Sequence, residues 1–192
     1  FVWWQQTLLR NGELGTAEMN FRLQKALNPK SADKAEIEIA SKTFRIGDKV
    51  MQIKNNYDIT WIRDDGEQGS GIFNGDIGII DSIDRKSRTL IVIFDDKTAK
   101  YTYEYATDLD FAYAVTVHKS QGNEFDCVII PMFQGPPQLY YRNLLYTAVT
   151  RAKKTLVLVG NPKTVEYMVQ NNRRTKRYSG LKEFLLRDEQ LY

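Results

Sequence analysis

Cysteine and histidine are almost absent from this sequence of 192 residues, and each shortage excludes a class of site. The single cysteine, Cys127, has no partner for an internal disulfide, so a disulfide framework is excluded and a reducing, cytoplasmic location is expected. The single histidine, His118, leaves no set of imidazoles to hold a metal ion. We therefore expect no metal site built from this chain.

Long apolar runs are missing as well. No stretch approaches the roughly 20 residues needed to cross a bilayer, so no membrane partner is expected. The first six residues, FVWWQQ, lack the basic region and the cleavage site of a secretory signal. They also lack an initiating Met, so we expect the sequence to be part of a longer protein.

A phosphate-binding loop is the third absence. The sequence has no Gly-x-x-x-x-Gly-Lys-Ser/Thr motif and no Asp-Glu pair after a predicted strand. These motifs hold nucleotide phosphates and Mg²⁺ in many ATPases. The chain by itself is therefore predicted to hydrolyse no ATP.

Basic charge is present but concentrated. Residues 140–178 contain nine Lys or Arg and one acid, Glu166, so this segment carries +8 while the net charge of the whole chain is +3. Such a concentration suits a polyphosphate partner. A solvated helix face followed by a basic loop is the alternative explanation.

The hydrophobic pattern predicts a short helix followed by many short strands. Glu18–Leu27 is predicted as a helix with Met19, Leu23 and Leu27 on one stripe. The Trp-rich start does not resemble a strand, and residues 30–43 are predicted as a polar linker. After Phe44, the short strands suggest a small antiparallel barrel, with an exposed loop or hairpin at 57–71. The predicted strands of the barrel cover residues 49–54, 76–83, 89–94 and 100–105.

The pattern changes to alternating strands and helices after residue 109. Strands are predicted at 113–117, 126–131 and 155–159. Helices are predicted from Pro136 to Lys154, from Pro162 with Asn161 as N-cap, and after Ser179. The fold class is therefore α/β, with a barrel at 44–108 inserted into a domain formed by residues 1–43 and 109–192.

Two segments carry residues that fit poorly into a core. The segment Val117–Asp126 (VHKSQGNEFD) places six polar residues and a glycine between two predicted strands, where α/β proteins often bind ligands. The segment Leu145–Lys154 (LYTAVTRAKK) places Arg151 in a largely apolar predicted helix. A buried arginine needs a partner, which can be a phosphate or a carboxylate. Each segment alone is compatible with an ordinary polar loop or a structural ion pair.

As a pair, the two segments resemble motifs V and VI of superfamily 1 helicases. Upstream, FRIGDKVMQ at 44–52 and FNGDIG at 73–78 resemble the RecD/TraA branch, or exodeoxyribonuclease V α-like proteins. The resemblance covers residues 12–186 and implies the second RecA-like domain, a parallel sheet with flanking helices, carrying an inserted SH3-like barrel. The first RecA-like domain, with the phosphate loop, is then expected in the N-terminal half of the same protein.

The resemblance implies roles at the nucleotide. Arg151 corresponds to the motif VI arginine that reaches the γ-phosphate, where a planar guanidinium can pair with two oxygens. Glu124 corresponds to an acid that contacts the nucleotide sugar, although a contact with a helix N-terminus would look the same in sequence. Gln121 and Gly122 would connect this side to the DNA-facing side, with Gly122 allowing either a tight turn or a close approach of the backbone.

The resemblance also implies contacts to single-stranded DNA. Thr116, His118, Lys119 and Ser120 correspond to the DNA-facing part of motif V, and a buried, structural His118 is the alternative. In the barrel, Asn55, Asn56, Asn74 and Trp61 are candidates, with Trp61 offering a stacking face. Asn74-Gly75 is equally well explained as a turn.

The implied parent protein is a bacterial ATP-dependent DNA helicase that moves 5′ to 3′ on single-stranded DNA in recombination or repair. Its expected partners are ATP with Mg²⁺, single-stranded DNA, its own N-terminal half, and other recombination subunits. The alternative is a stand-alone module that binds nucleic acid or peptides without motor activity.

Overall fold

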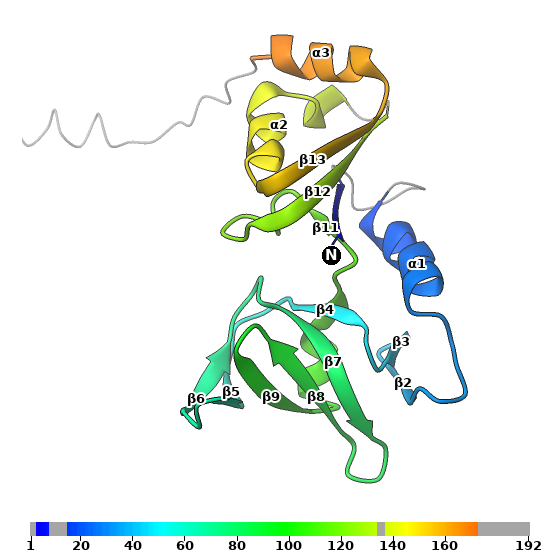
Figure 1. Ribbon diagram of the computed structural model, residues 1–192, viewed down its shortest axis with the longest axis vertical. Helices are drawn as coiled ribbons and strands as arrows, with labels where there is room; N and C mark the ends of the chain where they lie inside the picture. Colours follow the sequence, from blue (N-terminus) through cyan, green and yellow to red (C-terminus); the bar gives the residue numbers. More distant parts are fainter. Residues whose placement is uncertain (1–2, 8–14, 134–136, 173–192) are drawn as a thin grey trace, which may run out of the picture.

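The computed structural model describes residues 3–7, 15–133 and 137–172, which form two units (Figure 1). One unit is a parallel sheet with helices, and the other is a small antiparallel barrel. The chain leaves the first unit after helix α1 (Thr16–Leu27), builds the barrel, and returns at strand β11 (Ala114–Thr116). The prediction of a barrel inserted into an α/β domain is confirmed. Within the described part of the chain, no helix is long and apolar enough to cross a membrane.

The parallel sheet has the strand order β11-β1-β12-β13. Strand β1 (Trp3–Thr7) pairs with β11 on one side and with β12 (Phe125–Met132) on the other. The expectation that the Trp-rich start is not a strand was therefore wrong. The sequence WWQQT has no aliphatic run typical of an inner strand, and its place in the sheet comes from pairing with neighbours more than 100 residues away in sequence.

The connection between β12 and β13 (Ala152–Gly160) differs from the prediction. In place of one helix ending at Lys154, the structure has a short 3-10 turn η2 (Pro137–Leu139) and helix α2 (Arg142–Val149), while Pro136 lies outside the described residues. Ala152 pairs with Phe125, so the chain has already become a strand at that point. Arg151 consequently lies in the tight connection between α2 and β13.

Strand β13 lies at the edge of the described sheet. The sequence predicts residues 155–159 as buried, yet Leu156, Leu158 and Val159 are 39%, 40% and 45% exposed. These side chains are exposed because β13 is at the edge of the sheet, where β12 is its one partner strand among the described residues. Helix α3 (Pro162–Gln170) follows as predicted, and the Asn161 side chain caps it by accepting a hydrogen bond from the backbone N–H of Lys163. The helix predicted after Ser179 lies outside the described residues.

Helix α1 buries polar side chains where an apolar stripe was predicted. Leu27 is 62% exposed, while Asn20 and Gln24 are each 6% exposed. Asn20 Oδ1 accepts from the backbone N–H of Ala114 at 2.8 Å, and Asn20 Nδ2 donates to the Ala114 carbonyl at 2.9 Å. The stripe is polar because Asn20 faces backbone groups of β11, while Gln24 faces Thr43 O and the Asp48 carboxylate, and these buried groups need partners.

The polar stretch predicted as a linker contains a hairpin. Strands β2 (Glu36–Ile39) and β3 (Lys42–Arg45) pair antiparallel around Ala40 and Ser41, which have φ values of 49° and 65°. Both turn residues thus lie in the left-handed region, as in two-residue hairpin loops whose twist matches the strands.

The barrel is an antiparallel sheet with the order β10-β4-β7-β8-β9-β5-β6. The segment at 57–71, predicted as an exposed loop or hairpin, lies in a hairpin of two barrel strands. The expectation that it stays out of the core was wrong, because Ile59 is buried there, as is Ile72 at the end of the second strand. Tyr101 is fully buried, and its hydroxyl donates to Gln52 Oε1 at 3.0 Å. The strands are β4 (Lys49–Gln52), β5 (Asn56–Arg63), β6 (Gln68–Ile72), β7 (Ile77–Asp84), β8 (Thr89–Phe94), β9 (Lys97–Thr102) and β10 (Leu109–Phe111), with a 3-10 turn η1 (Tyr105–Asp108) before the last.

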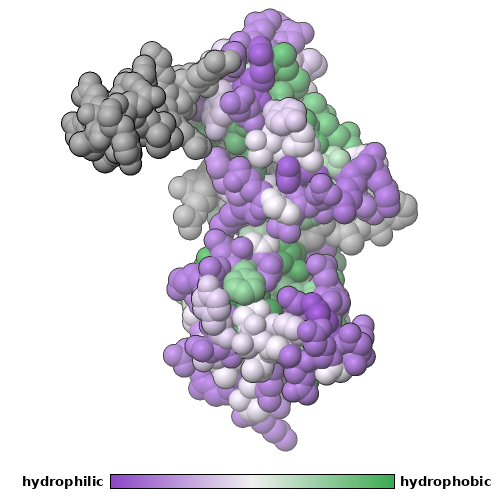
Figure 2. Space-filling model, turned by 90° about the vertical axis from the view of Figure 1, so that its left-hand side faces the viewer, coloured by the Kyte–Doolittle hydropathy of each residue, from purple (hydrophilic) through white to green (hydrophobic). Residues whose placement is uncertain are grey.

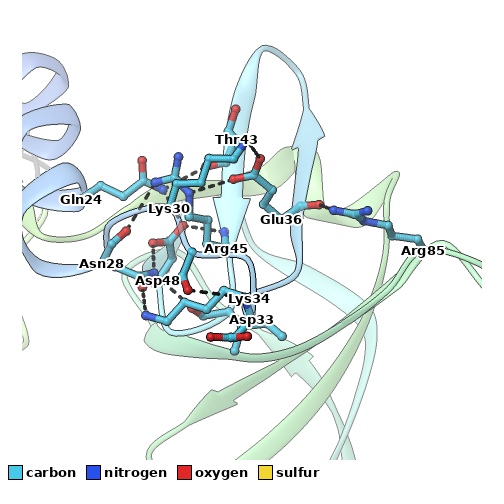
Figure 3. A network of polar contacts seen from close by, with 12 residues as sticks. Gln24, Asn28, Lys30, Asp33, Lys34, Glu36, Thr43, Arg45, Asp48 and Arg85 are labelled. Atoms are coloured by element: carbon cyan, nitrogen blue, oxygen red, sulfur yellow. Dashed lines mark hydrogen bonds and ion pairs between the residues drawn. The ribbon is translucent and has the colours of Figure 1, made fainter.

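A buried carboxylate joins the two units. Asp48, at the entry to β4, is completely buried and accepts from Gln24 Nε2 at 2.6 Å and from Asn28 Nδ2 at 2.6 Å (Figure 3). It also accepts from the Tyr113 hydroxyl at 2.8 Å and from the backbone N–H of Arg45 at 2.7 Å. Burial, and then the charge of Asp48, raises the pKa of Tyr113, which therefore remains a donor. The carboxylate holds α1, the barrel and the approach to β11 in one arrangement.

Candidate nucleotide and nucleic-acid interface

The segment between β11 and β12 folds into consecutive tight turns. The backbone N–H of Ser120 donates to Thr116 O, and that of Asn123 donates to Ser120 O, both at 3.1 Å. Gly122 has a φ of 90°, a conformation that L side chains rarely adopt, so the predicted use of glycine for a tight turn is confirmed. In the described part of the chain, no atom beyond the adjacent residues lies within 4 Å of the position that a Cβ would take there, so the reason for the glycine is conformational.

The turns divide the segment into an exposed and a buried side. His118, Lys119 and Gln121 are exposed, which rules out a buried, structural His118. Ser120 is fully buried, and its hydroxyl donates to Val117 O at 2.8 Å. The Thr116 hydroxyl accepts from the backbone N–H of Lys119 at 3.3 Å. The exposed members of the set can reach a partner, whereas Ser120 serves the loop itself in this structure.

Among the described residues, the guanidinium of Arg151 is held by neutral oxygen atoms. Nε donates to Thr147 O at 3.2 Å, Nη1 to Asn123 O at 3.2 Å, and Nη2 to the Thr150 hydroxyl at 3.4 Å. The Thr150 hydroxyl in turn donates to carbonyls of α2. No carboxylate of the described residues lies within ion-pairing distance of Arg151, so the structural salt bridge considered as its alternative role is not formed there.

Glu124 and Arg151 occupy equivalent positions on adjacent strands. Each residue immediately precedes its strand, and the first residues of the two strands, Phe125 and Ala152, pair with each other. The Phe125 N–H donates to Arg151 O at 2.8 Å. Glu124 is exposed and lies 3.5 Å from the equally exposed Lys153 Nζ. Glu124 thus precedes a strand, and its ion pair within the described part of the chain is with Lys153.

Asn123 connects this edge of the sheet to the barrel. Its carbonyl accepts from Arg151, and its Nδ2 donates to Gly75 O at 3.2 Å. Asn123 carries no signal in the sequence, because it stands between the recognisable positions Gly122 and Glu124 and its residue type does not mark a contact of this kind. A single residue thus touches the candidate arginine and a barrel turn.

That barrel turn is formed by Asn74 and Gly75, as the turn interpretation expects. Gly75 has a φ of 101°, and the N–H of Asn74 donates to Asn55 Oδ1 at 2.9 Å. Asn56 Oδ1 accepts from the N–H of Asp58 at 3.0 Å. The three asparagines therefore shape this end of the barrel, and the exposed Asn74 side chain remains available to a partner.

Trp61 is packed into the barrel wall. Its ring lies so close to Gly69 that a Cβ at that position would overlap it. Lys97 Nζ lies 4.8 Å and the Arg63 guanidinium carbon 5.0 Å from the ring centroid, as in cation–π contacts. The ring also packs against the hydrophobic core of the barrel. With these neighbours, Trp61 does not present the open stacking face that its sequence context suggested.

A cleft of about 790 Å³ lies where the barrel approaches the start of β12 and β13. Figure 2 shows hydrophobic colour at this junction, whereas the visible face of the barrel is mostly hydrophilic. Burial lowers the pKa of Lys49 on its wall. Six carboxylates against three lysines make the cleft a poor site for a triphosphate. The acids are Asp76, Asp81, Asp95, Asp96, Glu124 and Asp126.

Comparison with known proteins agrees with this arrangement. A family model described as the ATP-dependent RecD-like DNA helicase SH3 domain matches residues 19–94, and the UvrD-like helicase C-terminal domain matches residues 111–159. The ATP-dependent RecD2 DNA helicase of Deinococcus radiodurans is 32% identical over 155 residues, which cover 81% of this chain and 19% of that protein. The RecBCD enzyme subunit RecD of Mycobacterium tuberculosis is 36% identical over 120 residues, covering 60% of this chain and 20% of that subunit.

Solved structures show the same fold. Pif1 from Bacteroides, crystallised bound to single-stranded DNA, has a TM-score of 0.52 and 15% identity, over 98% of this chain and 46% of that chain. The fold and the matched models are those of the second RecA-like domain of a superfamily 1 helicase with an inserted SH3-like barrel. The chain belongs to the RecD-like branch of that superfamily and corresponds to its C-terminal part, spanning about a fifth of the length of the relatives named above.

Proposed function

We propose that this chain supplies one wall of the ATP site and part of the single-stranded DNA track of an ATP-dependent DNA helicase. ATP and Mg²⁺ would be held mainly by another motor domain in the same protein, with Mg²⁺ neutralising charge on the phosphates. The proposed parent travels 5′ to 3′ in recombination or repair in the cytoplasm, alongside other recombination subunits.

The environment of Arg151 carries this proposal. Within the described part of the chain, the Arg151 guanidinium has no carboxylate partner, and the attraction of an unpaired cation to an anion is strong where water is partly excluded. In phosphoryl transfer, negative charge spreads over the oxygens of the γ-phosphate, and a planar guanidinium can donate to two of them. Asn123 O, Thr147 O and Thr150 hold the side chain in place for this contact.

The neighbouring residues have compatible roles in the proposal. Glu124, beside Arg151, would accept from the hydroxyls of the ribose. Gln121 and Gly122 would link the nucleotide side to the DNA side through the tight turns. On the DNA side, we assign phosphate contacts to His118, Lys119 and Thr116, with Ser120 supporting the loop from within. Such contacts give affinity without sequence preference.

The barrel would extend the track. Asn56 and Asn74 lie at the end of the barrel that Asn123 touches. Their amides can donate to phosphate oxygens or to base edges. Trp61, enclosed by Gly69 and its two cationic neighbours, would support the barrel instead of stacking on a base.

The test compares arginines in the full-length protein that contains this chain. Arg151→Ala should lower DNA-stimulated ATP hydrolysis by roughly 10³-fold, the scale of other arginine fingers, while single-stranded DNA affinity stays within about twofold. Arg142→Ala is the matched control, because Arg142 Nε donates to Val169 O at 2.5 Å and Arg142 lies at the start of α2, the helix that precedes Arg151. ATP hydrolysis that survives Arg151→Ala within a few-fold would favour a binding module without a motor role.

A further inference from the structure

The barrel exposes two aromatic rings beside the loop proposed to face DNA. Tyr57 is 67% and Phe73 is 40% exposed, and their ring centroids lie 5.6 Å apart at an interplanar angle of 75°. Neither ring belongs to the barrel core. Covering an exposed aromatic surface of this kind with a flat partner is favourable, because apolar area is removed from water.

The chain holds the pair in position. Tyr57 is on β5, and Phe73 follows β6, the neighbouring strand. The Phe73 N–H donates to Asp76 Oδ2 at 2.8 Å, which fixes the backbone after the strand. The ring lies over Gly71, where a Cβ would approach Phe73 Cζ to 3.1 Å. The pair is thus preorganised, which lowers the entropic cost of binding.

The location connects the pair to the helicase motifs. Phe73 and Gly75 belong to the same barrel turn, and Gly75 O accepts from Asn123 in the segment between β11 and β12. The exposed Asn74 side chain lies between these two positions in sequence. The turn that carries Phe73 therefore touches the segment that carries His118 and Lys119, and it adds aromatic faces and amide groups to the proposed track.

We infer that Tyr57 and Phe73 form a nucleobase-stacking site for single-stranded DNA, an inference that rests on the proposed function. Stacking on aromatic side chains tolerates every base, because each base has a π face. It suits a translocating protein that must not read sequence. The pair thereby takes the role that the sequence suggested for Trp61, whose ring is enclosed.

The experiment is a titration of fluorescently labelled oligothymidine with the 192-residue chain at several salt concentrations. Tyr57→Leu and Phe73→Leu should each weaken binding roughly fivefold or more, with an unchanged salt slope, because stacking is not a charge effect. Tyr167→Leu is the matched control: Tyr167 is 49% exposed on α3, at the far end of the other unit (Figure 1). Thermal unfolding of each variant checks the fold.

An abasic oligonucleotide of the same length separates stacking from other effects. The wild-type chain should bind it more weakly than oligothymidine, and Tyr57→Leu should cause no further loss. Wild-type-like affinity of both Tyr57→Leu and Phe73→Leu for oligothymidine, with salt-dependent binding intact, overturns the stacking site alone. An equal loss on abasic and normal strands overturns it as well. Absence of any salt-dependent binding by the wild-type chain overturns the proposed DNA track and the stacking site together.

Discussion

Replacing Asp48 tests whether one buried carboxylate joins the barrel to the parallel-sheet unit. Asp48 is 0% exposed and accepts four hydrogen bonds, from Gln24, Asn28, Tyr113 and the backbone of Arg45. Asp48→Ala leaves these donors without that acceptor. Gln24 and Asn28 keep one further acceptor each, in Thr43 O and Ile46 O, which limits but does not remove the loss.

The magnitude follows from the number of donors. A buried donor left without its acceptor costs about 1–3 kcal/mol. Four donors at the lower end of that range give about 4 kcal/mol, against a total stability of about 5–15 kcal/mol for a typical protein. Asp48→Asn keeps the shape but turns an NH₂ group towards other donors, so we expect an intermediate loss of about 2 kcal/mol.

The assay is urea unfolding followed by far-ultraviolet circular dichroism, with the free energy of unfolding obtained by linear extrapolation. Asp33→Ala is the matched control, since Asp33 is exposed near the same network (Figure 3) and should change stability by about 0.5 kcal/mol or less. If the free energy of unfolding of Asp48→Ala is within about 1 kcal/mol of the wild-type value, the carboxylate does not join the two units as its hydrogen bonds indicate.

Three further outcomes are expected of the 192-residue chain. It should release no phosphate from ATP above a blank, with or without DNA, and measurable turnover would contradict the proposed division of the site. Lys119→Ala should reduce the salt slope of single-stranded DNA binding by roughly 0.7, the value for one lost phosphate contact; an unchanged slope would remove Lys119 from the track. Contacts with Lys30 and then Arg45 lower the pKa of Glu36, so their contribution to stability is present above the ordinary glutamate range and lost as pH falls through the lowered value. Urea unfolding at several pH values should therefore show a shallower acid-side decline for Glu36→Gln, and an unchanged decline would assign it to other groups.

For Trp61, the structure predicts a role in stability, whereas the sequence suggested stacking on DNA. Because its partly buried ring packs on Gly69 and the barrel core, Trp61→Ala should destabilise the chain by about 3 kcal/mol in urea unfolding, the lower end of the range for truncating a buried tryptophan. Its effect on oligothymidine affinity should be small under conditions where the variant remains folded. A large loss of affinity with unchanged stability would restore the stacking role to Trp61.

Sequence alone was sufficient where the information is local. Asn161 and Pro162 start α3 because the asparagine side chain and the preset proline φ act within one helical turn. Residues 89–94 form β8 because their apolar run is short and bounded by turn residues. Motifs V and VI could be recognised because the spacing of residue types within each segment is itself the signal.

The tertiary structure decided what those segments face. The polar stripe of α1 has meaning only once the backbone of β11 and the carboxylate of Asp48 are placed against it. Ser120 and His118 are two residues apart in one loop, yet one is buried and the other exposed, because a tight turn separates them. An apolar or aromatic residue type shows what can be buried, but not which neighbours cover it. For this reason Trp61 looked available in sequence and is enclosed in the fold, while Tyr57 and Phe73 became visible as a pair only when two strands brought them together.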